Sequence, residues 1–200
     1  WHIECSAMST KYLGKTFDIH TGGIDLAPIH HNNEIAQSES ACDCTLSHYW
    51  LHNEFVNVPE GPEGQANGAG KMAKSAGNFF TIRDIEKAGF SPLAYRYFLL
   101  MAHYRTPVTF TWEALEAAQN AYNRLKKFVT GLPVSGIVDE GYKDKFKEKL
   151  ENDLNTPQAL AVVWGLIKDA EVSSEDKLAT LLDFDQVLGL GLGGSPQLTH

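Results

Sequence analysis

The 200-residue sequence has few cysteines, no long apolar run and no excess of positive charge. Its three cysteines are too few and too scattered for a disulfide framework, which excludes the small disulfide-stapled secreted domains. No apolar stretch approaches the ~18 residues of a membrane-spanning helix, and no signal-peptide pattern opens the sequence. We therefore expect a protein of the reducing cytoplasm with no membrane partner.

The shortage of positive charge restricts any interpretation as a nucleic-acid-binding protein. A formal net charge of −8 argues against broad, non-specific binding, which needs a basic face. A local basic strip remains compatible with RNA binding. Hydrophobic residues at 43% and charged residues at 21% are ordinary for a globular protein, and the length suits one large domain or two small ones.

The first part of the chain shows the order strand, glycine turn and helix. Residues 17–20 are predicted to form a strand that runs into a turn at 21–23, and a helix is predicted from 30 to about 40. Aromatic and β-branched residues predict a strand at 51–58, followed by a glycine- and proline-rich loop at 59–70. This order predicts a parallel α/β sheet with ligands at the strand ends.

After residue 80 the pattern becomes helical. Ser91 is a predicted N-cap followed by proline at the first helical position. Three further helices are predicted to begin at Thr111, at Asn155 and at Ser174, each with an apolar stripe at helical spacing. From about residue 110 onward we expect an antiparallel helical bundle.

Cys5, His30 and Glu34 are candidate metal ligands. Thiolate, imidazole and carboxylate all bind zinc, and three protein ligands leave one position for a substrate. His30 and Glu34 lie four residues apart, which places them on one face of a helix. His31, three residues before Glu34, competes with His30 for this role. The plainer alternative is a buried cysteine and a histidine at a helix start.

Two other groups are candidates for binding a nucleotide. Lys71 and Lys74 lie in a glycine-flanked stretch, from which both ammonium groups can reach a triphosphate; the alternative is a solvated surface loop. Gly22 and Gly23 would let a ribose approach the backbone, with Asp25 accepting hydrogen bonds from its hydroxyls. By themselves, these three residues are more typical of a tight turn with a solvated acid.

Two patterns are better explained without function. The glycines near the end match a dinucleotide fingerprint, but no helix can follow them, so we expect a flexible tail. Two cysteines and a histidine resemble a metal cluster without a fourth ligand, so free thiols are expected. These residues are Gly189, Gly191 and Gly194 in the first pattern, and Cys42, Cys44 and His48 in the second.

Several blocks in a fixed order resemble the cysteinyl-tRNA synthetase family. They cover nearly the whole chain except the 59–70 loop and the residues after about 190, which makes the resemblance more specific than any single motif. The blocks are residues 1–8, 18–26, 30–39, 49–53, 71–75, 96–100 and 153–160.

The resemblance implies a class I aminoacyl-tRNA synthetase, which joins L-cysteine to tRNA(Cys) through a cysteinyl-adenylate made from ATP with Mg²⁺. In that family two cysteines, a histidine and a glutamate hold Zn²⁺, and Cys5, His30 and Glu34 match three of them. The family's other zinc cysteine and its His-Ile-Gly-His signature lie upstream of the matched blocks. We therefore expect this chain alone not to catalyse cysteine-dependent ATP–pyrophosphate exchange.

The implied organisation has four parts. Residues 1–80 correspond to the second half of a Rossmann-like catalytic domain with its lysine loop, and 81–110 to a connecting, stem-contact segment. Residues 111–190 correspond to a tRNA-binding helical bundle and 191–200 to a tail.

The resemblance also assigns roles to single residues. Lys74, assisted by Lys71, would balance charge on the phosphates as pyrophosphate leaves, and Trp1 would close over the substrate cysteine. The adenylate site would be lined by Gly22, Gly23 and Asp25, and the tRNA backbone contacts would come from Arg124, Lys126 and Lys127.

The sequence departs from the family in a few places. Ala73 stands where serine is common, Thr21 and Asn32 replace a usual glycine and acid, and the 59–70 loop is unusually long. Two alternatives stay open: the related ligase that joins cysteine to an amino-sugar in mycothiol synthesis, and a non-catalytic, tRNA-binding paralogue.

Overall fold

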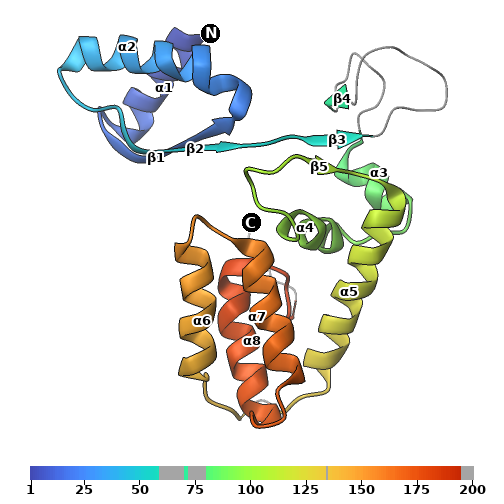
Figure 1. Cartoon of the computed structure of the whole chain (residues 1–200). Coiled ribbons are helices and arrows are strands. Elements are labelled where there is room, and N and C mark those ends of the chain that lie inside the picture. The colour runs from blue at the N-terminus through green and yellow to red at the C-terminus, as the bar shows by residue number, and fades with distance from the viewer. Residues whose placement is uncertain (59–69, 72–79, 134, 195–200) are drawn as a thin grey trace. The chain divides into compact units, whose positions relative to one another are not determined.

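The computed structural model describes residues 1–58, 70–71, 80–133 and 135–194, and the chain divides into two compact units (Figure 1). Unit 1 comprises Trp1–Phe55 and Tyr104–Pro107, and unit 2 comprises Val56–His103 and Val108–His200. A hydrogen bond of 2.8 Å from the Glu54 amide to the Tyr104 carbonyl joins the two segments of unit 1. Among the described helices, none is long and apolar enough to cross a membrane.

Unit 1 contains a two-stranded parallel sheet. The strands pair in register from Phe17 opposite Ser47 to Gly23 opposite Asn53. In Figure 1 the two longer helices of the unit lie on the same side of this sheet. The elements are α1 (His2–Leu13), β1 (Phe17–Gly23), η1 (Ile24–Leu26), the π-helical turn η2 (Ala27–His31), α2 (Asn32–Cys42) and β2 (Ser47–Asn53).

The predicted α/β class and parallel sheet are confirmed for unit 1, with two changes. The glycine turn at 21–23 was wrong, because these residues continue β1 and pair with β2 to its end. The single strand predicted at 51–58 is two strands, since β2 ends at Asn53 and β3 begins at Val56. The helix predicted from residue 30 is confirmed as α2, which η2 extends backward without a break.

Unit 2 begins with a small three-stranded sheet in the order β4-β3-β5. β3 (Val56–Val58) pairs antiparallel with β4 (Gly70–Lys71) and parallel with β5 (Val108–Thr109). Six helices complete this unit in its described part: α3 (Ile82–Lys87), α4 (Pro92–Leu100), α5 (Trp112–Thr130), α6 (Glu140–Glu151), α7 (Thr156–Lys168) and α8 (Ser174–Leu188).

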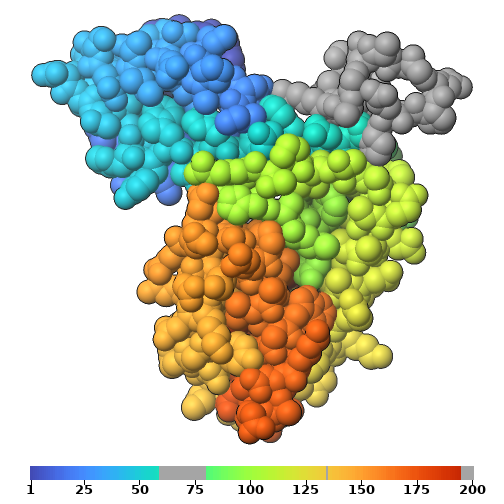
Figure 2. All heavy atoms as spheres, viewed as in Figure 1, coloured from blue at the N-terminus to red at the C-terminus, as the bar shows by residue number. Residues whose placement is uncertain are grey.

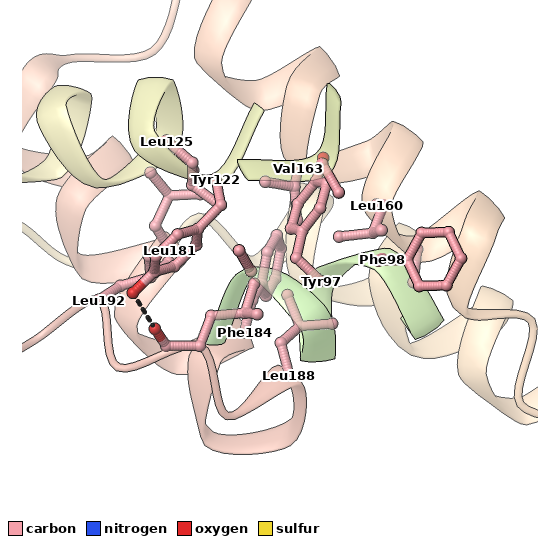
Figure 3. Close-up of a cluster of buried hydrophobic side chains, with 14 of the residues drawn as sticks. Tyr97, Phe98, Tyr122, Leu125, Leu160, Val163, Leu181, Phe184, Leu188 and Leu192 are labelled. Carbon is pink, nitrogen blue, oxygen red and sulfur yellow. Dashed lines mark hydrogen bonds between the residues drawn. The ribbon is translucent and has the colours of Figure 1, made fainter. Parts of the chain in front are cut away.

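One hydrophobic core holds unit 2 together (Figure 3). Phe146 of α6 stacks on Phe184 of α8 with ring centroids 4.1 Å apart. Trp164 of α7 donates a hydrogen bond of 2.9 Å to the Tyr97 hydroxyl of α4. In the space-filling view the side chains of α6, α7 and α8 form one continuous surface (Figure 2). The bundle predicted from residue 110 is therefore confirmed as helical, and α4 belongs to the same core.

Side-chain caps fix the helix starts of unit 2. Ser91, Thr111 and Asn155 each accept a hydrogen bond from an amide of the first turn, as their positions predicted. α8 begins at Ser174 as predicted, and Ser173 is its cap, whose hydroxyl accepts a hydrogen bond from the Asp176 amide.

The flexible glycine tail predicted near the C-terminus is wrong for residues 189–194. Gly189 ends α8 in the left-handed region at φ 62°, which favours glycine. Leu190 and Leu192 are then buried in the core. The Tyr122 hydroxyl donates to the Leu190 carbonyl at 3.0 Å (Figure 3), and the Asp185 carboxylate accepts from the Leu190 and Leu192 amides at 2.6 and 2.7 Å.

Replacing Asp185 with alanine should destabilise unit 2 by about 1.5–3 kcal/mol, because hydrogen bonds to a charged acceptor contribute in this range. The free energy of unfolding from urea denaturation measures the change. Asp183→Ala is the matched control: its carboxylate lies on the same helix and makes a partly exposed ion pair of 3.7 Å with Lys143, worth about 0–1 kcal/mol. Equal losses in both variants would contradict the prediction.

Candidate metal centre

The structure brings Cys5, His30 and Glu34 together. Their ligand atoms all lie within 4.8 Å of one another, although they come from α1, η2 and α2. A π-helical turn is uncommon and often marks a functional site, and here it carries His30 directly before the helix that carries Glu34. Sulfur, imidazole nitrogen and carboxylate oxygen form a donor set suited to zinc.

Glu34 is the centre of this cluster. It is completely buried, and within the described part of the chain neither carboxylate oxygen makes a hydrogen bond. Three imidazole Nε2 atoms surround its Oε2 atom, at 3.4 Å (His20), 3.3 Å (His30) and 3.9 Å (His31). A buried carboxylate without a partner is costly, so the site fits a bound cation that would compensate it.

The pKa shifts of the cluster indicate that its histidines supply no positive charge to the Glu34 carboxylate. Burial lowers the pKa of His20, His30 and His31, that of His31 to about 4, so these rings are neutral at neutral pH and form no ion pairs with Glu34. Burial also raises the pKa of Glu34. The pKa of the Cys5 thiol is raised by burial and then by the charge of Glu34. A divalent cation would reverse both of the latter shifts.

Two further histidines orient the imidazoles at the centre. His2 Nδ1 lies 2.6 Å from His30 Nδ1, and His52 Nε2 lies 2.7 Å from His31 Nδ1. Each contact occupies the Nδ1 atom, which leaves Nε2 directed at Glu34, an arrangement typical of ligand histidines. No role was predicted from the sequence for His2, His20 or His52. The available signal was that six of the eight histidines fall within the first 52 residues.

Trp1 covers one side of the cluster. Its indole ring stacks on the His30 imidazole, with centroids 3.7 Å apart and planes 12° from parallel. Trp1 is also 64% exposed in the described structure, so a small molecule that reaches His30 could contact it.

The predicted ribose-binding residues have a role within the protein itself. A Cβ atom on Gly22 would lie 2.7 Å from His31 Cε1 and 2.8 Å from a Leu26 methyl group. A Cβ atom on Gly23 would lie 2.5 Å from the Asp25 carboxylate. Gly22 is therefore required for His31 to pack against β1.

Gly22→Ala should displace the His31 ring and destabilise unit 1 by roughly 1–3 kcal/mol, as overpacking of a buried site does. Amide hydrogen exchange in β1 and α2 measures this loss. Gly165→Ala in α7 serves as the control, since the added methyl group meets Tyr142 at an ordinary 3.9 Å and alanine favours the helix. Unchanged exchange in Gly22→Ala would show that His31 is not held as described.

The remaining residues with a predicted role are the two lysines, Arg124 and the two neighbouring cysteines. Lys71 is the last residue of β4, and Lys74 lies outside the described residues. Arg124 places its guanidinium 5.5 Å from the Trp164 ring centre. Free thiols at Cys42 and Cys44 were the wrong expectation, because the two form a disulfide across the left-handed residue Asp43, which brings them together at the end of α2.

Both units contain residues that match known protein families. Residues 1–120 match the family described as the tRNA synthetases class I (C) catalytic domain, and residues 145–193 match the DALR domain. The chain is 46% identical to a cysteine--tRNA ligase 1 of Burkholderia lata over 192 residues, which is 96% of this chain and 39% of that protein. It is 42% identical to a cysteine--tRNA ligase of Treponema denticola over 218 residues, 96% of this chain and 42% of that protein.

A solved structure shares the fold. The methionyl-tRNA synthetase of Mycobacterium tuberculosis, bound by methionyl-adenylate, superimposes with a TM-score of 0.51 at 16% identity, covering 87% of this chain and 40% of that one. At this identity the likeness concerns the fold alone. The chain thus spans about 40% of the length of the proteins it resembles.

Proposed function

The chain belongs to the family of class I (C) tRNA synthetase catalytic domains, and from this premise we propose that it is the cysteine-selecting part of a cysteine--tRNA ligase. The observation that carries the proposal is the convergence of the ligand atoms of Cys5, His30 and Glu34. The Glu34 carboxylate is buried and accepts no hydrogen bond from the part of the chain that the structure describes. The reaction would consume L-cysteine and ATP with Mg²⁺, form cysteinyl-adenylate and transfer cysteine to tRNA(Cys).

The selection problem explains why such a site would use a metal. Cysteine and serine differ by one atom, and a pocket that judges size alone separates such substrates only weakly. A bound Zn²⁺ would supply a soft partner for the substrate sulfur as thiolate, for which a serine hydroxyl is a poor substitute. Cys5, His30 and Glu34 would hold that ion, and the family's second zinc cysteine is not among the residues matched here.

The other residues would bind and orient the substrates. Trp1, which stacks on His30 and is largely exposed, would close over the cysteine. The adenylate would lie against the end of β1, where Gly22, Gly23 and Asp25 follow one another. Lys71 and Lys74 would neutralise charge on the phosphates as pyrophosphate leaves.

The tRNA would be bound by the helical part of the chain. The DALR match and the names of the relatives favour a tRNA acceptor over the amino-sugar of the mycothiol ligase. The exposed side chains of Arg124, Lys126 and Lys127 on α5 are the proposed backbone contacts. We place the protein in the cytoplasm, as its composition and the family of its relatives favour.

A chimera tests the proposal. Residues 1–193 would replace the corresponding segment of the Burkholderia lata relative, and cysteine-dependent ATP–pyrophosphate exchange and tRNA charging would be measured. The chimera should charge tRNA with cysteine and reject serine. Cys5→Ala should lower kcat/KM for cysteine by at least about 100-fold. Losing a residue that only hydrogen-bonds to a metal ligand costs up to about 100-fold, and losing a ligand itself should cost no less.

Met8→Ala, a change of an exposed residue on the same helix as Cys5, is the matched control and should leave kcat/KM unchanged. An active chimera in which Cys5→Ala has no effect would overturn the zinc-based selection. A folded chimera that binds zinc but charges no tRNA would overturn the assignment as a ligase.

A further inference from the structure

We propose that His20, His31 and Glu34 form a second cation site, for a divalent transition metal held without sulfur. This site lies beside the one proposed for zinc and shares Glu34 with it. The inference depends on the arrangement of these side chains alone and stands whether or not the chain selects cysteine.

The three ligand atoms already converge. They lie within 4.8 Å of one another, with His20 Nε2 at 3.4 Å and His31 Nε2 at 3.9 Å from Glu34 Oε2. The residues come from three different elements, β1, η2 and α2. The fold therefore brings them together from positions up to 14 residues apart rather than along a single helix turn.

Neighbouring groups fix both imidazole rings. The Trp50 indole of β2 stacks on His20, with centroids 4.6 Å apart and planes 21° from parallel, and also lies 5.0 Å from the His31 ring. His52 holds His31 through its Nδ1 atom at 2.7 Å. Ligand histidines are commonly fixed in this way by a partner on the other nitrogen, and Gly22 leaves the space that His31 occupies.

The proposed site is open to solvent on the side of His20. Glu34 and His31 are buried, whereas the His20 side chain keeps 16% of its surface exposed. A cation would enter past His20, and three protein ligands would leave a position for water.

The donor set determines which cations fit. Two imidazoles and a carboxylate suit Zn²⁺, Co²⁺, Ni²⁺ and Cu²⁺, and affinity should rise toward copper in the usual order. The site that contains Cys5 adds a thiolate and prefers softer ions. Because Glu34 Oε2 faces the Nε2 atoms of His20, His30 and His31 together, the two sites would compete for one oxygen. Filling the sulfur-free site would therefore weaken binding at the other.

The test uses the 200-residue chain, stripped of metal and titrated with Co²⁺. The double variant Cys5→Ala/His30→Gln removes both ligands that belong only to the sulfur-containing site. We expect it to bind one Co²⁺ per chain, by mass spectrometry and by a visible spectrum lacking the sulfur charge-transfer band. Adding His20→Gln or His31→Gln should abolish this stoichiometric binding.

His48→Gln, added to the same double variant, is the matched control, since His48 is exposed on β2 and is not part of either group. It should retain the Co²⁺. No binding by the double variant, or binding that survives both His20→Gln and His31→Gln, would overturn the second site. Since His20 is partly exposed, His20→Gln decides the question even if His31→Gln impairs folding. Failure here would leave the chimera's activity untouched, so the two proposals fail separately.

Discussion

Glu34→Gln is expected to abolish stoichiometric zinc binding and, at the same time, to stabilise the metal-free protein. Both effects follow from one feature, a fully buried carboxylate whose two oxygens make no hydrogen bond within the described structure. Removing the charge relieves a desolvation cost of about 1–3 kcal/mol, and more for a charged group. The metal-bound protein would lose its anionic ligand, so the sign of the effect reverses with zinc.

Unfolding measurements with zinc and with a chelator test this reversal. At a zinc concentration 100 times the Kd, the unaltered chain should gain about 2.7 kcal/mol, whereas Glu34→Gln should gain nothing. Glu4→Gln controls for the loss of an exposed acid on α1. A metal-free Glu34→Gln variant less stable than the unaltered chain would indicate that Glu34 has a hydrogen-bonding role instead.

The candidate site could be predicted from the sequence because its main spacing is local. His30 and Glu34 lie four residues apart, and the continuous helical stretch from η2 into α2 keeps that spacing on one face. Cys5 and His20 come from elements distant in the sequence, and nothing in their spacing specifies their approach. Cys5 was predicted as a ligand from the family resemblance. His20 could be identified only from the structure, which brings β1 and η2 together.

The missed elements have weak local signals. α6 is highly charged and buries only Phe146, so its apolar stripe is short. α1 buries only Ser6 and exposes most of its apolar residues, among them Ile3 and Tyr12. The residues after α8 pack on the core through Leu190 and Leu192, which are separated by a glycine. Their burial depends on the distant Tyr122 and on Asp185, which no pattern within the segment indicates.

Phe184→Ala is expected to be the most destabilising single change in unit 2. Phe184 is 1% exposed, and its ring stacks on that of Phe146 with centroids 4.1 Å apart and planes 7° from parallel. Truncating a buried phenylalanine to alanine costs about 3–5 kcal/mol, and the paired rings add to that cost. A domain is stable by about 5–15 kcal/mol, so the variant would lose a large share of it.

Urea denaturation followed by helical circular dichroism measures this loss, because most helical residues belong to unit 2. Val187→Ala on the same helix is the control: Val187 is 55% exposed, and surface changes of this kind stay within about 0.5 kcal/mol. The stack joins α6 to α8, and Phe146 is the only buried residue of α6, so α6 depends on this contact. Phe184→Ala should therefore increase amide exchange in α6 more than in α5, and equal exchange in both helices would contradict this role.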